Sequence, residues 1–194
     1  MNARNCFAAL AAALALAACS QKDPANEAIE AAANALNAVY EDAQMYVPER
    51  YAEVKAELDT ARKAFEEERY ADAIAAVKDV PTHAEALSQE AAAAKAKHVA
   101  DMNADWMRLS GSLPDRFTGI GSRLDELGRM KKLPEGMDRQ LLDEAKAAFA
   151  SAQSAWEEAG AAFAKGDLDA AVGKAKDAEG MAQDLAARLG MQTG

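Results

Sequence analysis

Residues 51–68 (YAEVKAELDTARKAFEEE) align without a gap with residues 142–159 (LDEAKAAFASAQSAWEEA). A second gapless alignment joins residues 64–87 with residues 162–185, and the offset between the copies changes from 91 to 98. The difference of seven residues is one heptad, an insertion that lengthens a helix by about two turns and keeps its apolar face nearly in register. The sequence therefore predicts one helix–turn–helix unit that is used twice.

Apolar side chains in both copies recur at alternating steps of three and four residues, as in Tyr51, Val54, Leu58, Ala61 and Phe65. Such spacing places the side chains on one face of a helix, and it favours nearly antiparallel helices that cross at shallow angles. Turns are expected at Arg69-Tyr70 and at Gly166-Asp167, and Asp138 is the expected cap of the helix between them.

The composition supports the same fold class, because Ala, Glu, Lys and Leu dominate and no alternating β-branched run is present. We expect an all-α, elongated antiparallel bundle that forms a single helical domain over residues 24–194. Its two related hairpins span about 48–109 and 138–190, and a linking helix spans about 113–130. Ser110-Gly111-Ser112 is the expected break before that linking helix, and Pro81 the expected kink inside a long helix.

The first eighteen residues have the three zones of an export signal. Arg4 supplies the positive charge, the apolar run Cys6 to Leu16 (CFAALAAALAL) follows, and small residues come next. The apolar run is too short to span a bilayer, which needs about 20 residues. These residues predict that the chain is exported.

Leu16-Ala17-Ala18-Cys19 resembles the lipobox of bacterial lipoproteins, Leu-small-small-Cys. The resemblance implies a signal peptide over residues 1–18, cleavage between Ala18 and Cys19, and acyl chains (typically palmitate) on Cys19. Residues 19–23 would then form a lipidated tether. Ser20 follows the cysteine, where lipoproteins kept in the inner membrane often carry Asp, so the resemblance favours the outer membrane, periplasmic face, over the inner membrane.

The charge of the chain excludes several classes of function. Cleavage after Ala18 removes Arg4 and no acidic residue, which leaves 21 basic against 32 acidic residues and a net charge of −11. Nucleic-acid binding needs a basic face, and electrostatic docking on anionic lipid needs basic residues as well. Cys6 leaves with the signal and Cys19 carries lipid, so disulfides and cysteine-ligated zinc are also excluded in the mature chain.

The repeated hairpins resemble tetratricopeptide-type hairpins in the pattern Ala-x-x-Ala-Phe, an acidic or Gly-Asp turn, then Tyr/Leu-x-x-Ala-Ile/Val-x-x-x-Lys. They are more similar to the Ala-rich helical domain of unknown function in proteobacterial lipoproteins. The resemblance covers about half the chain. It implies a helical fold and no particular activity, and two copies are fewer than the three that a solenoid needs.

No catalytic residue, metal ligand or cofactor site is predicted. His83 and His98 are the only imidazoles, and on one straight helix 15 residues apart they would lie about 22 Å from each other. His98 and Asp101 form an i, i+3 pair, for which a position on the helix surface is the simpler interpretation. The zinc-protease motif His-Glu-x-x-His is absent from the sequence.

The predicted function is therefore a non-enzymatic protein-interaction or scaffold module of the cell envelope, whose partner is an envelope protein or a second copy. Trp106, Met107, Leu113 and Pro114 are the candidate partner-binding residues, because aromatic residues near an exposed loop are typical of docking surfaces. One alternative is a carrier of a small hydrophobic ligand, with a cavity near Phe117, Phe149 and Trp156. Another is an enzyme, which would need a cleft that gathers His98 with several carboxylates.

Overall fold

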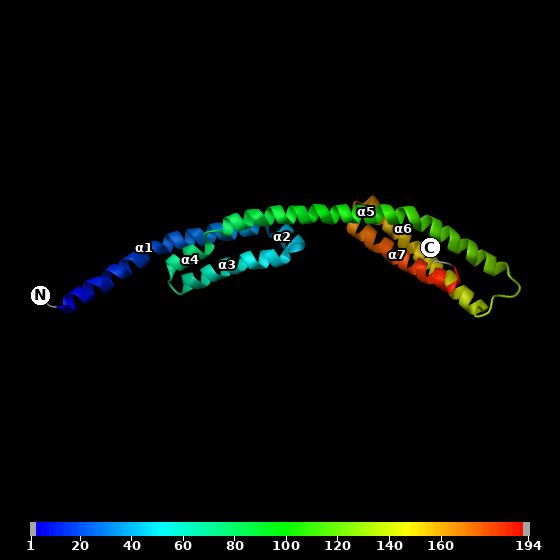
Figure 1. Ribbon diagram of the computed structural model, residues 1–194, viewed down its shortest axis with the longest axis horizontal. Coiled ribbons are helices and arrows are strands. Elements are labelled where there is room, and N and C mark those ends of the chain that lie inside the picture. The colour runs from blue at the N-terminus through cyan, green and yellow to red at the C-terminus, as the bar shows by residue number, and fades with distance from the viewer. Residues whose placement is uncertain (1–2, 192–194) are drawn as a thin grey trace. The chain divides into compact units, whose positions relative to one another are not determined.

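The computed structural model describes the backbone of residues 3–191 and the side chains of residues 21–191 (Figure 1). Residues 3–191 contain helices and no strand, so the predicted all-α fold is confirmed. In chain order the helices are α1 (Ala3–Ala38), α2 (Tyr40–Tyr46), α3 (Pro48–Glu66), α4 (Tyr70–Val77), α5 (Val80–Arg129), α6 (Arg139–Ala164) and α7 (Leu168–Arg188).

The helices pack as two compact units, residues 1–97 and residues 98–194. The boundary between the units falls inside α5, so this one helix contributes its first part to one core and its second part to the other. The sequence predicted a single helical domain over residues 24–194, whereas the packing divides that range in two. The second predicted hairpin lies within the second unit, whereas the first, predicted to end at about residue 109, crosses the boundary, and its last residues belong to the second unit.

In the first unit, α3 and α4 pack against α1, and the first part of α5 completes the core. The large side chains of this core that are almost fully buried are Leu36, Val54, Val80 and Leu87. Alanines such as Ala32 and Ala61 are completely buried and occupy the contacts between helices. Because alanine is small, these positions let the helix axes approach closely.

In the second unit, α6 and α7 lie side by side along their lengths, and the second part of α5 packs on them. Its fully buried residues include Leu109, Leu113, Ile120, Leu142 and Leu185. The cap predicted for α6 is confirmed, because the Asp138 carboxylate accepts a hydrogen bond from the backbone N–H of Leu141 at 2.8 Å. This bond satisfies one amide that the first turn of a helix leaves unpaired.

The turns of the two hairpins share one backbone geometry. Glu68 and Gly166 lie 98 residues apart and both have a positive φ, 57° and 80°. In each turn the next residue donates its amide N–H to the carbonyl oxygen five residues earlier, at 2.9 Å in the first hairpin and 3.1 Å in the second. This is the Schellman arrangement, in which a left-handed residue ends a helix. The turn at Gly166-Asp167 lies where the sequence predicted it, whereas the first turn ends at Arg69, because Tyr70 is already the first residue of α4.

The two hairpins differ in length by one heptad, as the alignments predicted, because α3 has 19 residues and α6 has 26. Because Glu68 and Gly166 are equivalent turn residues, each residue of the first hairpin corresponds to the residue of the second whose number is higher by 98 (the n + 98 count). Buried positions agree on this count: Ala73, Val77, Val80, Ala84, Leu87 and Ala91 correspond to Ala171, Ala175, Ala178, Ala182, Leu185 and Leu189, all of which are buried. The structure therefore supports a repeated hairpin.

The break predicted at Ser110-Gly111-Ser112 is wrong, because α5 continues from Val80 to Arg129 without interruption. The linking helix expected at about 113–130 is therefore the second part of α5. Gly111 costs about 1 kcal/mol relative to alanine in a helix, and Pro114 costs about 3. Each buried leucine contributes roughly 1.5–3 kcal/mol. Leu109 and Leu113 are both fully buried on this stretch, which offsets the poor local propensity.

The kink predicted at Pro81 is a helix boundary. α4 ends at Val77, and α5 begins at Val80 with Pro81 as its second residue. Proline has no N–H to donate to the carbonyl four residues earlier, and its ring clashes with that carbonyl in a continuous helix. At the start of a helix the missing N–H costs nothing, because the first amides are unpaired in any case.

Candidate interaction surface

The predicted anchor lies within α1, before the first residue whose side chain is described. Ala18 and Cys19 fall within the range of α1, and their side chains lie outside the described residues. The tether predicted at residues 19–23 also belongs to α1, which continues through Pro24. Among the described residues, none of the helices has the combined length and hydrophobicity that a membrane crossing requires.

In the second unit, three aromatic rings stack on one another. The Trp106 ring centroid on α5 lies 4.4 Å from that of Phe163, with an angle of 10° between the planes. On α6 the Trp156 ring is also stacked with Trp106, with centroids 5.5 Å apart and an angle of 22°. We call Trp106, Trp156 and Phe163 the aromatic surface, because none of the three is buried and Phe163 is 44% exposed.

Two ion pairs between α5 and α7 flank Trp106 in the sequence. Lys176 Nζ lies 2.7 Å from Asp105 Oδ2, and Arg108 donates to both carboxylate oxygens of Glu179, at 2.7 and 3.1 Å. A two-point contact between a guanidinium and a carboxylate fixes orientation as well as distance. The pairs therefore hold the turn of α5 that carries Trp106 in a defined position on α7.

The ion pairs also change the titration of their acids. Hydrogen bonding from Arg108 lowers the pKa of the Glu179 carboxyl, and hydrogen bonding from Lys176 lowers the pKa of Asp105. The Glu179 side chain is only 17% exposed, whereas its partner Arg108 is about half exposed. The Glu179 carboxylate is thus largely shielded from solvent, so its ionised form depends strongly on the nearby positive charge of Arg108.

The structure separates the four residues that the sequence nominated for partner binding. Met107 is 74% exposed and follows Trp106 directly on α5. Leu113 is fully buried in the core, so its nomination is wrong: the expected loop is helix, and Leu113 lies on the inward face. Pro114 is exposed but lies inside α5. Of the nominated residues, Met107 and Pro114 are therefore exposed, and Trp106 is partly buried against the core of the second unit.

Phe163 was missed in this role because its spacing places it on the apolar stripe of α6. The first hairpin shows why it is exposed. Its counterpart there, Phe65, packs edge-on against Tyr70 at a centroid distance of 5.2 Å. Leu168 occupies the position of Tyr70 in the second hairpin. In the sequence, the leucine in place of that tyrosine was the signal that Phe163 lacks the aromatic partner of Phe65. The Phe163 ring stacks on Trp106 instead.

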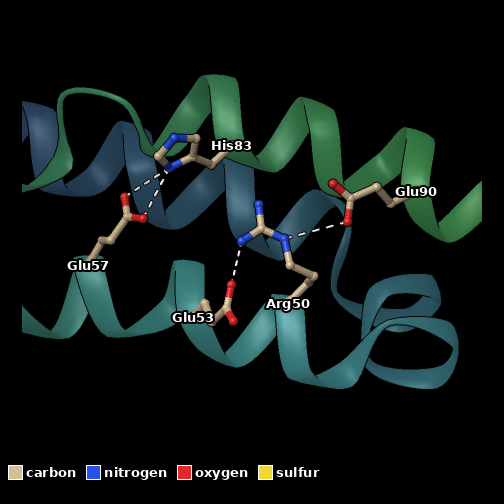
Figure 2. Close-up of polar contacts among 5 residues, drawn as sticks. All are labelled: Arg50, Glu53, Glu57, His83 and Glu90. Carbon is tan, nitrogen blue, oxygen red and sulfur yellow. Dashed lines mark hydrogen bonds and ion pairs between the residues drawn. The ribbon is translucent and has the colours of Figure 1, made fainter.

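The first hairpin presents a charged seam between α3 and α5, shown in Figure 2. His83 Nδ1 lies 3.0 and 3.1 Å from the two carboxylate oxygens of Glu57. Arg50 extends toward two acids, with Nε 3.5 Å from Glu90 Oε2 and a second nitrogen bonded to Glu53. Glu53 and Glu90 both raise the pKa of the Arg50 guanidinium. The His83–Glu57 and Arg50–Glu90 contacts join the two helices across the seam, whereas the Arg50–Glu53 contact lies within α3.

The enzyme alternative depended on His98. Its Nε2 atom lies 2.6 Å from Asp169 Oδ1 on α7, a partner that the sequence did not predict, and the Asp169 side chain is largely exposed. His83 belongs to the first unit and pairs with Glu57 there. Over residues 21–191, no three His, Cys, Asp or Glu side chains are grouped closely enough to hold a metal ion.

The carrier alternative depended on a cavity near three rings, and those rings contact aromatic neighbours. Phe117 on α5 and Phe149 on α6 meet edge to face, with centroids 6.0 Å apart. Trp156 stacks on Trp106. Edge-to-face and offset-stacked pairs are favourable packing arrangements of aromatic side chains. Each of the three rings thus packs against another aromatic side chain.

Comparisons with known proteins returned no match: no family model, no curated protein and no solved structure is significantly similar to this chain.

Proposed function

We propose that this protein is a membrane-anchored periplasmic lipoprotein whose helical body acts as a non-enzymatic interaction module of the cell envelope. The observation that carries the proposal is the aromatic surface of the second unit, with Met107 beside it in the sequence. Tryptophan and other aromatic side chains are enriched among the residues that dominate binding energy at protein interfaces. A partner that covers this surface would bury large apolar rings.

The ion pairs on either side of Trp106 support the same proposal. Binding costs conformational entropy when side chains must be ordered at the interface. Here Trp106 is already held between two rings, and Asp105 and Arg108 are already fixed to α7. A preorganised surface loses less freedom on binding, so more of the contact energy appears as affinity.

The lipobox supports the membrane location of the module. Two or three acyl chains on Cys19 contribute about 0.8 kcal/mol per buried methylene, which gives stable anchoring where a single chain gives only reversible binding. The body carries a net negative charge and has no electrostatic reason to lie against anionic lipid. The lipid then fixes the location, and the helical surfaces are left for protein partners. We place the protein at the periplasmic face of the outer membrane.

Site-specific photo-crosslinking in cells tests the proposal. A benzophenone amino acid at Met107, which is 74% exposed, is compared with the same probe at Met45, which is 71% exposed on α2 of the other unit. We expect a discrete crosslinked species from position 107 that mass spectrometry identifies as one envelope protein, and none from position 45. Identical products from both positions, or none from either, would contradict a docking role for this surface.

A further inference from the structure

The charged seam of the first hairpin has a different counterpart in the second. On the n + 98 count, Arg50 corresponds to Ala148, Glu57 to Ala155 and His83 to Met181. Three of the ion-pairing side chains are thus replaced by small or apolar ones, whereas Glu90 corresponds to the oppositely charged Arg188. Lys174 on α7 and Glu158 on α6 form an ion pair elsewhere along the two helices. Within residues 21–191, however, the counterparts of the seam residues form no such bridge.

A groove lies where those charged contacts would be. It has a volume of about 290 Å³ and is lined by Ala148, Ser151, Met181, Asp184, Leu185 and Arg188. Four of these six residues are the direct counterparts of Arg50, Glu53, His83 and Glu90. A second groove of about 220 Å³ continues past Arg188 toward Met137 and Leu141. We call the two together the α6–α7 groove.

Several apolar side chains of the α6–α7 groove are exposed. Leu141 and Met181 are each 44% exposed, which is high for residues of their size. Arg188 lies between the two grooves and makes no ion pair or hydrogen bond within residues 21–191, whereas its counterpart Glu90 is paired with Arg50. An apolar groove beside an unpaired cation is typical of a surface that another helix covers.

We infer that the occupant is the same groove of a second copy, so that two α6–α7 hairpins form a four-helix bundle about a two-fold axis. The larger groove is complementary to itself in charge, and Glu144 adds an acid beside Arg188 in the smaller one. Asp184 and Arg188 lie one helical turn apart on α7 and both line it. A two-fold axis between them places Asp184 of each copy opposite Arg188 of the other.

The shape of the groove fits the same arrangement. Met181 lies on one side of that axis and Leu141 on the other, because α6 and α7 run in opposite directions. Rotation about the axis brings Met181 of one copy toward the Leu141 end of the groove of the other. Ala148 and Ser151 lie near the axis, where small side chains permit close approach of the helices.

Charge also selects this face over others for self-association. The chain carries a net charge of −10, so most pairs of surfaces on two copies repel. The larger groove is lined by one acid and one base and is locally neutral. The equivalent face of the first hairpin already uses its charges within the chain. The inference rests on this groove and is independent of the lipid anchor and of the aromatic surface.

A charge-exchange experiment on the full chain tests it. Two differently tagged copies are co-expressed, and the fraction recovered together after solubilisation is measured. We expect Asp184→Arg alone and Arg188→Asp alone to weaken self-association about tenfold or more, because each places like charges opposite one another. Co-expression of Asp184→Arg with Arg188→Asp should restore the pairing, since each variant then meets an opposite charge on the other copy.

Glu157→Arg is the matched control, because it reverses an exposed charge on α6 that lines neither groove. It should leave self-association within twofold of the unaltered chain, and circular dichroism should show all variants equally helical. Wild-type copies that do not recover one another would overturn the inference. Normal self-association of Asp184→Arg or of Arg188→Asp would also overturn it, as would a failure of the two variants to associate when they are co-expressed. These outcomes do not depend on what the aromatic surface binds.

Discussion

Glu68 and Gly166 occupy the same position in the two hairpins and share a left-handed backbone, with φ of 57° and 80°. Among residues 3–191, Glu68 is the one non-glycine residue with a positive φ. The turn therefore imposes its geometry even where the sequence does not supply a glycine. The Schellman hydrogen bonds, which are the same in both turns, hold Glu68 in a conformation that side chains disfavour.

Substitutions at these two positions should have opposite effects on stability. Glu68→Gly removes about 1–2 kcal/mol of strain from the left-handed backbone. Glycine also makes the unfolded chain more flexible, which destabilises the folded state by about 0.4–1 kcal/mol, so we expect a net gain in stability of about 0.5–1 kcal/mol. Gly166→Ala should cost about 1 kcal/mol for the same reason. Chemical denaturation followed by circular dichroism measures both. Glu66→Gly, at the end of α3, should be destabilising, and a similar gain there would show that the geometry of Glu68 is not the cause.

Gly111→Ala tests the continuity of α5. A Cβ at this position would meet no atom within 4 Å, and the residue lies inside a helix rather than at the break that the sequence suggests. Alanine should therefore stabilise the protein by about 0.5–1 kcal/mol. Gly136 also has open space around it but has a φ of 83°, so Gly136→Ala should be destabilising. No gain from Gly111→Ala in a denaturation curve would indicate a non-helical backbone there.

The Arg108–Glu179 pair should make the second unit sensitive to acid. Arg108 lowers the pKa of Glu179 in the folded protein, so the pair contributes stability above the unfolded-state pKa of about 4.3. That contribution is lost as the pH falls through the lower, folded-state pKa. Glu179→Gln should cost roughly 1 kcal/mol or less at neutral pH and flatten the pH dependence below about pH 4.3.

Tryptophan fluorescence is the appropriate probe for that measurement, because both tryptophans, Trp106 and Trp156, belong to the second unit. Glu157→Gln serves as the control, since it removes the same charge from an exposed position on α6. If Glu157→Gln and Glu179→Gln altered the acid transition equally, general charge would explain the effect and the specific pair would not.

Cys19→Ser tests the proposed anchor. Without the thiol no acyl chain can be attached, so labelled palmitate should not be incorporated and the protein should leave the membrane fraction. A Cys6→Ser variant should label normally, because that residue lies in the predicted signal peptide and is removed. A Cys19→Ser variant that stays with the membrane as fully as the unaltered protein would show that something other than lipid holds it.

The hairpins could be predicted from the sequence because local signals and packing agree there. Gly166 and Asp167 are turn residues by their own chemistry, and the stripes on α6 and α7 face the core as their spacing indicates. The charged seam was also within reach of the sequence. Glu57 and His83 each lie 13 residues from Tyr70, and a hairpin centred there brings them together. The register of the turn was needed before that pairing could be recognised.

The remaining errors arise where tertiary packing overrides local propensity. Ser110-Gly111-Ser112 is a weak helix former, but the buried stripe that includes Leu109 and Leu113 keeps the chain helical through it. That same burial removes Leu113 from the candidate surface. Phe163 has the spacing of a core residue, and its exposure follows from Leu168, which replaces the aromatic partner found in the first hairpin. Neither effect can be read from one segment alone.

The central claim is that the aromatic surface binds a partner, and one measurement tests it most directly. The yield of the crosslink from position 107 is compared between the unaltered protein and Phe163→Ala in cells. Phe163 is 44% exposed, so its truncation should leave the fold intact while it removes an exposed ring of the stack. We expect the crosslink to fall about tenfold or more, as for a residue central to an interface. An unchanged yield at equal protein level would contradict the account.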